Sequence, residues 1–297
     1  MKLDAERLQR IRRLEIQTRR LVDSYFGGAY HAIFKGKGIE FESVRPYLPG
    51  DDIRAIDWNV TARTDEAFVK QFTEERELNL LLILDASPST SFGTRERHKR
   101  DLAVDVGAVL SYSAIRNQDR VGLLVFSHQV DLLIPPMRGR NHGLRLLREL
   151  LYLEGAVAAG YTDLVGALQR AGRLLKRRSI VVLLSDFWVP LESLEPDLTR
   201  LARRHDVIAI VLRDTLERVW PDVGLIRLKD SETGVTHVVD TASALWRDQV
   251  EQDARQFDLH LQALFGRLQI DSLFLTTQSD AVVELTRLFR SRLTRIR

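Results

Sequence analysis

The sequence contains no cysteine. It therefore has no disulfide bond, no zinc–thiolate site, no iron–sulfur cluster and no cysteine nucleophile. Its seven histidines include no pair spaced as H-x-x-x-H, the spacing that puts two zinc ligands on one helix face. Function classes that depend on thiols are excluded, and a histidine-based zinc site is not expected.

Long apolar segments are also missing. No uninterrupted apolar stretch approaches the ~20 residues that span a bilayer. The basic N-terminus is not followed by an apolar segment, so no signal peptide is predicted. Since the absence of cysteine fits a reducing compartment, we expect a soluble, cytoplasmic protein without a membrane span.

The sequence has little excess charge of either sign, with a net charge of only +3. Its basic residues gather at the ends: residues 1–20 carry seven Lys and Arg against three acids, and residues 287–297 carry five Arg and no acid. Solvent-exposed helices would account for the basic residues at both ends of the chain. The alternative is that these ends contact a membrane surface peripherally. Nucleic-acid binding is not expected, because no aromatic residues are interleaved with the basic ones.

Short apolar runs alternate with helical patterns from Leu78 onward. Runs of this kind, rich in Val, Ile and Leu, are typical of strands buried on both faces. They predict strands at 78–85, 120–127, 179–186, 206–214 and 271–277. Helices are predicted at 96–117, 140–152, 163–177, 191–204, 241–267 and 280–294. The alternation predicts an α/β fold with a doubly wound, mainly parallel sheet of the Rossmann-like kind.

Two segments within this region depart from the alternation. VDLLIPP at 130–136 directly follows the second run, and its two prolines favour an antiparallel strand at the edge of the sheet. The stretch 218–240 is predicted to contain a hairpin insertion that turns between Glu232 and Gly234.

The first 77 residues have a different character. An apolar stripe at helical spacing predicts an amphipathic helix at 3–23, and a turn-rich, charged stretch with short alternating segments follows it. We therefore expect a helix with a small β-containing extension at 1–77 and an α/β domain at 78–297.

Oxygen-bearing side chains follow two of the predicted strands. Asp85, Ser87 and Ser89 come directly after the first, in DASPS, and Asp186 ends SIVVLLSD. Thr162, in GYTDL, precedes the helix that leads into the second of these strands. Ligands of open parallel sheets bind beyond the carboxyl ends of strands, where the strand order reverses, so we expect all five residues to converge on an exposed sheet edge.

Carboxylates and hydroxyls without His or Cys are hard oxygen donors, which suit Mg²⁺ or Mn²⁺. The alternative is structural, with Ser87 and Ser89 capping the next turn and Asp186 accepting hydrogen bonds from backbone amides.

The five residues resemble the metal-ion-dependent adhesion site of the von Willebrand factor A fold, written D-x-S-x-S followed by a later Thr and a later Asp. The resemblance implies that Ser87, Ser89 and Thr162 approach the ion directly or through water. It also implies that Asp85 and Asp186 act through bridging water. An ion held in this way keeps an open position, which a Glu or Asp of a partner protein can fill.

The segment GKGIEFESVRPYLPGDDIRAIDWNVTAR at 36–63 resembles the signature of the bacterial "domain of unknown function 58" family. The matching residues are Gly36, Gly38, Glu40, Phe41, Arg45, Tyr47, Pro49, Gly50, Asp51, Asp52, Arg54, Asp57, Trp58, Ala62 and Arg63. Many relatives carry two N-terminal membrane helices, and this chain has a charged helix instead. The resemblance implies partners among MoxR-type AAA+ ATPases and other A-domain proteins, in the assembly, maturation or metal loading of client proteins.

The charged residues of this block alternate with Ile53, Ile56 and Trp58. We expect a salt-bridged network that fixes the extension to the body, with Trp58 packed as a large apolar anchor. The alternative is a docking surface for the ATPase. The residues concerned are Arg45, Tyr47, Asp51, Asp52, Arg54, Asp57, Trp58 and Arg63.

An enzymatic function is a further alternative. Asp85 after a strand suggests the nucleophile of a Mg²⁺-dependent phosphohydrolase. Enzymes of that type resemble D-x-D, and this chain has Ser87 in place of the second acid. We therefore expect a non-enzymatic, metal-dependent protein-binding module that does not hydrolyse ATP. The alternative within the same fold is a metal-free scaffold that docks through residues 36–63.

Overall fold

The computed structural model describes residues 40–64, 66–73, 78–93, 97–153 and 161–296. The helix predicted at 3–23, and Gly36 and Gly38 of the family signature, lie outside the described residues.

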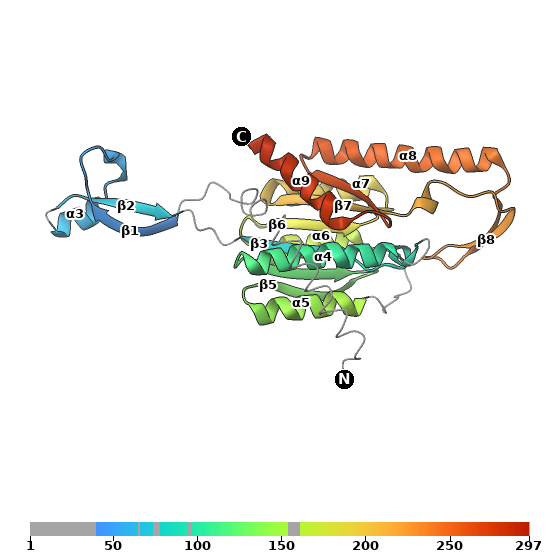
Figure 1. The fold of residues 1–297 in the computed structure, drawn as a ribbon, viewed down its shortest axis with the longest axis horizontal. Helices are drawn as coiled ribbons and strands as arrows, with labels where there is room; N and C mark the ends of the chain where they lie inside the picture. The colour runs from blue at the N-terminus through green and yellow to red at the C-terminus, as the bar shows by residue number, and fades with distance from the viewer. Residues whose placement is uncertain (1–39, 65, 74–77, 94–96, 154–160, 297) are drawn as a thin grey trace.

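A six-stranded sheet forms the centre of the molecule (Figure 1). Its strands are β3 (Asn79–Asp85), β4 (Arg120–Phe126), β5 (Val130–Met137), β6 (Ile180–Ser185), β7 (Asp206–Arg213) and β10 (Asp271–Thr276). The spatial order is β10-β7-β6-β3-β4-β5, with every pair parallel except β4 and β5. The predicted α/β fold with a doubly wound, mainly parallel sheet is confirmed.

Helices cover both faces of this sheet. One hydrophobic cluster joins it to α4 (Lys99–Arg116), α5 (Arg140–Tyr152) and α9 (Ala281–Ile296). The other joins it to α6 (Leu164–Leu174), α7 (Leu191–Arg204) and α8 (Ala244–Arg267). Successive residues of β3 alternate between the two clusters, with Leu82 in the first and Ile83 in the second. An uninterrupted apolar run is needed because both faces of the strand are covered.

The two departures from strand–helix alternation take the predicted forms. β5 is an antiparallel edge strand, where Pro135 and Pro136 remove amide donors that an interior strand would need. β8 (Leu225–Lys229) and β9 (Thr236–Asp240) form the predicted hairpin as a separate two-stranded sheet. None of the described helices is long and apolar enough to cross a membrane.

The N-terminal extension is built on another antiparallel pair, β1 (Glu40–Pro46) and β2 (Phe68–Thr73). Between these strands lie a short 3₁₀ turn, η2 (Ile53–Ala55), and the helix α3 (Trp58–Thr64). Figure 1 shows this unit set apart from the central sheet. The predicted β-containing extension therefore exists.

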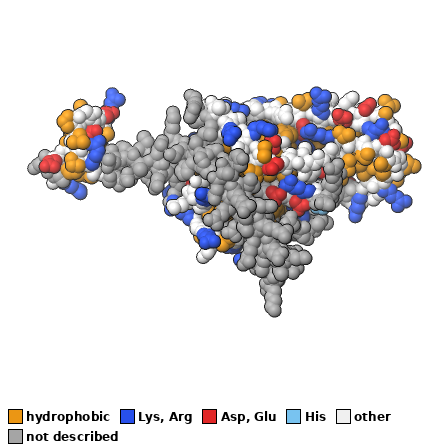
Figure 2. Space-filling model, in the orientation of Figure 1, with side chains coloured by type: hydrophobic (Ala, Val, Ile, Leu, Met, Phe, Trp, Pro, Cys, Tyr) orange, Lys and Arg blue, Asp and Glu red, His pale blue; other side chains and the backbone are white. Residues whose placement is uncertain are grey.

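The predicted packing of Trp58 is wrong. Trp58 is 67% exposed and Ile53 is 65% exposed, so no apolar anchor forms around the indole. A two-stranded sheet with one short helix has too little interior to enclose a side chain of this size. Asp57 is buried at this position instead, and Figure 2 shows hydrophobic side chains on the surface of the extension.

Replacing the exposed Trp58 should hardly affect folding. We expect Trp58→Ala to change the free energy of unfolding by at most ~0.5 kcal/mol, as at other surface positions. Phe126→Ala is the control, because Phe126 is fully buried in β4 and its loss should cost ~3–5 kcal/mol. Urea denaturation of both variants measures this difference, and similar losses for the two would show that Trp58 is packed in solution.

Candidate metal and partner-binding site

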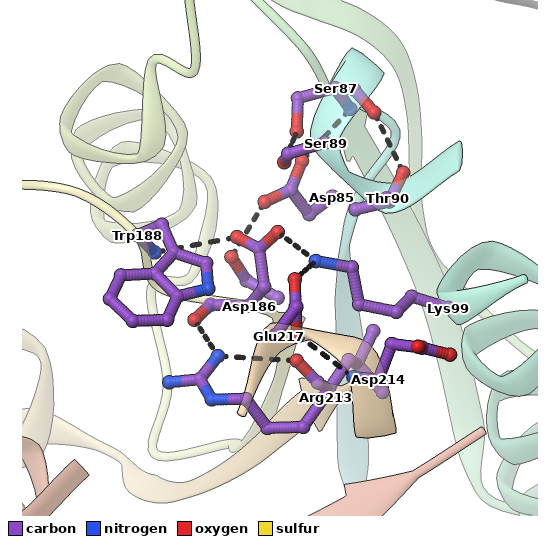
Figure 3. Close-up of polar contacts among 12 residues, drawn as sticks. Asp85, Ser87, Ser89, Thr90, Lys99, Asp186, Trp188, Arg213, Asp214 and Glu217 are labelled. Atoms are coloured by element: carbon purple, nitrogen blue, oxygen red, sulfur yellow. Dashed lines mark hydrogen bonds and ion pairs between the residues drawn. The ribbon is translucent and has the colours of Figure 1, made fainter. Parts of the chain in front are cut away.

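β3 and β6 are neighbours at the centre of the sheet, where the strand order reverses. Asp85 is the last residue of β3, and Asp186 directly follows β6. Reversal of the order makes the crossovers beyond these two strands run to opposite faces, which opens a place for a ligand between them. The structure therefore brings the two predicted acids to one end of the sheet (Figure 3).

The predicted exposure of Asp85 is wrong, because its side chain is fully buried. Its Oδ1 accepts a hydrogen bond from the amide of Ser87 at 2.9 Å, and its Oδ2 accepts one from the Ser185 hydroxyl at 2.6 Å. These bonds offset part of the cost of removing a carboxylate from water. The aspartate thus lies beneath the loop that it organises.

Ser87 and Ser89 lie together in that loop. Their hydroxyl oxygens are 3.0 Å apart, and Ser89 is the more exposed of the two. A 3₁₀ turn, η3 (Pro88–Ser91), sets their spacing, and the Thr90 hydroxyl closes it by donating to the Ser87 carbonyl at 2.7 Å. The buried guanidinium of Arg100 donates to the carbonyls of Ala86 and Ser87 at 3.1 and 3.2 Å.

Asp186 pairs with a buried lysine. The Nζ of Lys99, at the first residue of α4, lies 2.7 Å from Asp186 Oδ2 and also contacts Glu217 Oε1 (Figure 3). Glu217 is held in turn, because its other oxygen accepts a hydrogen bond from the amide of Asp214 at 2.8 Å. Ser89 also lowers the pKa of Asp186, which indicates that the serine loop lies close to the end of β6.

The electrostatics of the two acids differ. Burial, together with repulsion by Asp186, raises the pKa of Asp85 to about 7. Burial opposes the ionisation of Asp186 as well, but attraction by Lys99 and hydrogen bonds from Lys99 and Ser89 lower its pKa overall. Lys99 pairs with Asp186 and Glu217, Arg213 also attracts Asp186, and Arg100 attracts Asp85. Burial and the neighbouring acid nevertheless keep the pKa of Asp85 raised, so positive charge close to Asp85 would stabilise its ionised form.

Among the described residues, Thr162 is hydrogen-bonded to the β8–β9 hairpin and not to the other predicted site residues. Its hydroxyl donates a 2.6 Å hydrogen bond to Glu232 Oε1, in the turn of the β8–β9 hairpin. The loop that carries it is fixed to the end of β4, because the amide of Asp163 donates to the Ser127 carbonyl at 2.8 Å. Within the described part of the chain, no hydrogen bond joins Thr162 to the other four predicted residues. The structure thus gathers Asp85, Ser87, Ser89 and Asp186, and it places Thr162 against the hairpin.

A second polar group supports the loop after β6. Arg213 donates to the Asp186 carbonyl and pairs with the buried Asp258 of α8 at 2.7 Å. Its guanidinium lies 4.8 Å from the ring centroid of Trp188, which stacks on Phe257. These contacts fix the backbone that carries Asp186.

Lys99, Glu217 and Arg213 belong to the site in the structure but are not among the residues predicted from the sequence. A sequence signal existed for the first of them, since Lys99 and Arg100 begin a helix. Basic side chains are disfavoured at a helix N-terminus, where the helix dipole is positive, so a basic pair there indicates a local acidic partner. The other two residues follow apolar runs without a distinguishing pattern.

The family-signature residues lie in the N-terminal extension. Arg45 donates two hydrogen bonds to Asp51 at 2.6 and 2.7 Å, and this pairing lowers the pKa of Asp51 to about 2. Asp52 caps η2, and the amide of Tyr47 donates to the Ala67 carbonyl at 2.8 Å. Arg54, Trp58 and Arg63 are exposed. The predicted network therefore exists in part, inside the extension.

The sheet order, the antiparallel edge strand and the D-x-S-x-S loop at the order reversal define an α/β domain of the von Willebrand factor A-like kind. The chain belongs to the family described as "Protein of unknown function DUF58", whose model matches residues 43–258. The family resemblance of the sequence is thus confirmed.

Two relatives show how far the similarity extends along the chain. "Uncharacterized protein Rv1480" of Mycobacterium tuberculosis (strain ATCC 25618 / H37Rv) is 33% identical over 282 residues, covering 95% of this chain and 88% of that protein. "Uncharacterized protein YeaD" of Bacillus subtilis (strain 168) is 32% identical over 108 residues, covering 36% of this chain and 25% of that protein.

Two solved structures are distantly similar to the chain. BatB from Bacteroides thetaiotaomicron has a TM-score of 0.43 and 13% identity, over 73% of this chain and 99% of that one. A von Willebrand factor type A protein from Catenulispora acidiphila has a TM-score of 0.38 and 11% identity, over 76% of this chain and 43% of that one.

The raised pKa of Asp85 predicts a specific pH dependence. The protonated form of Asp85 is favoured in the folded state, so this contribution to stability is complete below the unfolded pKa of about 3.8 and is lost as pH rises through about 7. Asp85→Asn imitates the protonated form at every pH. In metal-free buffer, the melting temperature of Asp85→Asn relative to that of the wild type should rise by several degrees between pH 5 and pH 8. Parallel melting profiles would show that Asp85 is not strained by its burial.

Proposed function

We propose that this chain is a non-enzymatic protein-binding module that binds a carboxylate of a partner through a divalent cation at the ends of β3 and β6. The observation that carries the proposal is the cluster of Asp85, Ser87, Ser89 and Asp186. Four oxygen-bearing side chains converge there, and burial together with repulsion by Asp186 raises the pKa of Asp85 even though Arg100 attracts it.

These residues fit Mg²⁺ or Mn²⁺ by the chemistry of their donors. The Ser87 and Ser89 hydroxyls would hold the ion directly, with Asp85 and Asp186 supplying negative charge around it. Neutral hydroxyl ligands leave the ion acidic enough to bind one more carboxylate, which the partner supplies. Lys99 would then orient Asp186 without occupying all of its oxygens.

Exposed aromatic side chains beside the site loops support a protein ligand. Tyr161, next to Thr162, is 71% exposed, and Phe92 and Trp188 are partly exposed after the DASPS loop and after Asp186. Aromatic residues are enriched where proteins bind one another, because they bury much area at small entropic cost. Each of the three site loops thus offers an apolar contact beside a polar one.

The absence of enzymatic activity is part of the proposal. A nucleophilic aspartate must reach its substrate, and Asp85 is fully buried with both carboxylate oxygens hydrogen-bonded. The position of a second acid is occupied by Ser87. A Mg²⁺-dependent phosphohydrolase centred on Asp85 is therefore disfavoured.

The proposed partner is a MoxR-type AAA+ ATPase, acting with other A-domain proteins in the cytoplasm. Membership of the DUF58 family supports this partner through the association implied by the sequence resemblance. The exposed surface of the extension supports a second candidate function, a metal-free scaffold. Leu48, Ile53 and Trp58 are each at least 60% exposed there, which gives residues 36–63 an apolar surface for docking.

Metal binding can be tested without disturbing the core. We expect isothermal titration calorimetry to detect Mn²⁺ binding to the wild type, and Ser87→Ala combined with Ser89→Ala to weaken it at least tenfold. Ser91→Ala is a matched control from the same turn, because the Ser91 hydroxyl makes no hydrogen bond among the described residues. If all three proteins bind Mn²⁺ equally, or if none does, the metal-dependent function is wrong.

The two candidate functions predict that different variants lose affinity for a purified MoxR-type ATPase. A metal-dependent site predicts that the Ser87→Ala, Ser89→Ala double variant and a chelator each reduce binding at least tenfold, while Trp58→Ala has little effect. A metal-free scaffold predicts the reverse. Leu245→Ala removes an exposed apolar side chain elsewhere and serves as the control. Surface plasmon resonance measures all four proteins under identical conditions.

A further inference from the structure

A carboxylate of the β8–β9 hairpin, Glu232, is hydrogen-bonded to Thr162, the predicted site residue that lies apart from the other four. Glu232 Oε1 accepts the 2.6 Å hydrogen bond from Thr162, 70 residues away in the sequence. This length is typical of a charge-assisted bond from a hydroxyl to an ionised carboxylate. Figure 1 shows the hairpin at the end of the molecule toward which the parallel strands run.

The turn of the hairpin holds Glu232 in a defined place. The Asp230 carboxylate accepts hydrogen bonds from the Glu232 amide at 3.0 Å and from the Thr233 amide at 2.6 Å. The Thr233 hydroxyl adds a third bond at 2.8 Å, and Gly234 supplies the positive φ of 73° that the turn requires. The backbone around Glu232 is therefore ordered by local contacts, and its side chain is presented to Thr162.

The β8–β9 hairpin is separate from the central sheet, and one of its faces is largely exposed. It forms its own two-stranded sheet, with Leu225 74% exposed and Val238 64% exposed. Ile226, Leu228 and Val239 are half-buried, so the hairpin as a whole gains a moderate amount from burial. Hydrogen bonds of the Thr241 amide and hydroxyl to the Gly224 carbonyl join the two strands to each other at the base of the hairpin. The turn at 230–235 consists of polar residues, Gly234 and the exposed Val235, so lifting it away from Thr162 would expose little additional apolar surface.

We infer that Glu232 is an internal ligand of the partner-binding surface, which holds Thr162 until a carboxylate of the partner displaces it. The inference rests on the proposed function, because Thr162 belongs to the predicted ligand set. The group bonded to Thr162 is already a carboxylate, the same chemistry that the proposed partner supplies. The partner is accordingly a protein that presents Glu or Asp on an exposed turn, in the manner of this hairpin.

A peptide with the hairpin sequence, residues 225–240, offers a direct probe when added to the full chain. We expect it to bind the Glu232→Ala protein at least tenfold more tightly than the wild type in Mg²⁺, because the internal carboxylate no longer competes. Glu251→Ala is the control, since it removes an exposed acid of α8 and should leave the affinity at the wild-type level. The same peptide carrying Glu232→Gln should bind the Glu232→Ala protein at least tenfold more weakly.

Fluorescence anisotropy of the labelled peptide measures these affinities, and hydrogen exchange of the hairpin amides measures its attachment. Faster exchange at residues 225–240 in Glu232→Ala, but not in Glu251→Ala, supports the internal ligand. Equal peptide affinity for the wild type and Glu232→Ala, or unchanged hydrogen exchange, overturns the internal-ligand inference, regardless of whether peptide binding depends on metal. Tighter binding to Glu232→Ala that a chelator leaves unaltered supports the internal ligand and contradicts the metal-dependent function.

Discussion

Burial of Asp85 and Asp186 at neighbouring strand ends is the constraint on which the rest of the site depends. Two carboxylates removed from water require positive charge or hydrogen-bond donors close by. Lys99 supplies the charge to Asp186, and Ser185 and the Ser87 amide supply donors to Asp85. The start of α4, the serine loop and the end of β6 are held together by these contacts.

This arrangement separates charge from contact surface. The acids lie beneath the loops, whereas the more accessible polar groups are the hydroxyls of Ser89 and Thr162, with Tyr161 beside the latter. A partner would therefore meet hydroxyls and aromatic rings, with negative charge behind them. The proposed cation-mediated contact is compatible with such a surface, and the hairpin carboxylate at Thr162 shows how closely an acid can approach it.

Local sequence patterns predicted most of the fold, but they gave the wrong solvent exposure for two residues. The apolar runs and Pro135 located the strands, their burial and the edge position, because strand periodicity and the missing proline amide act locally. Trp58 was expected to be packed and is exposed, and Asp85 was expected at an exposed edge and is buried. Burial depends on which other segments cover a residue, and residue type does not specify that. The division of the chain near residue 77 stays a prediction.

The sequence by itself determined the α/β alternation, the antiparallel edge strand and the order of the D-x-S-x-S, Thr and Asp elements. Only the tertiary structure decided that Lys99 meets Asp186 across 87 residues and that Thr162 meets Glu232 instead of the serines. Periodicity within one segment specifies its conformation and its buried face. Contacts between distant segments follow from how helices and hairpins pack on the finished sheet, so their partners become visible only in the folded chain.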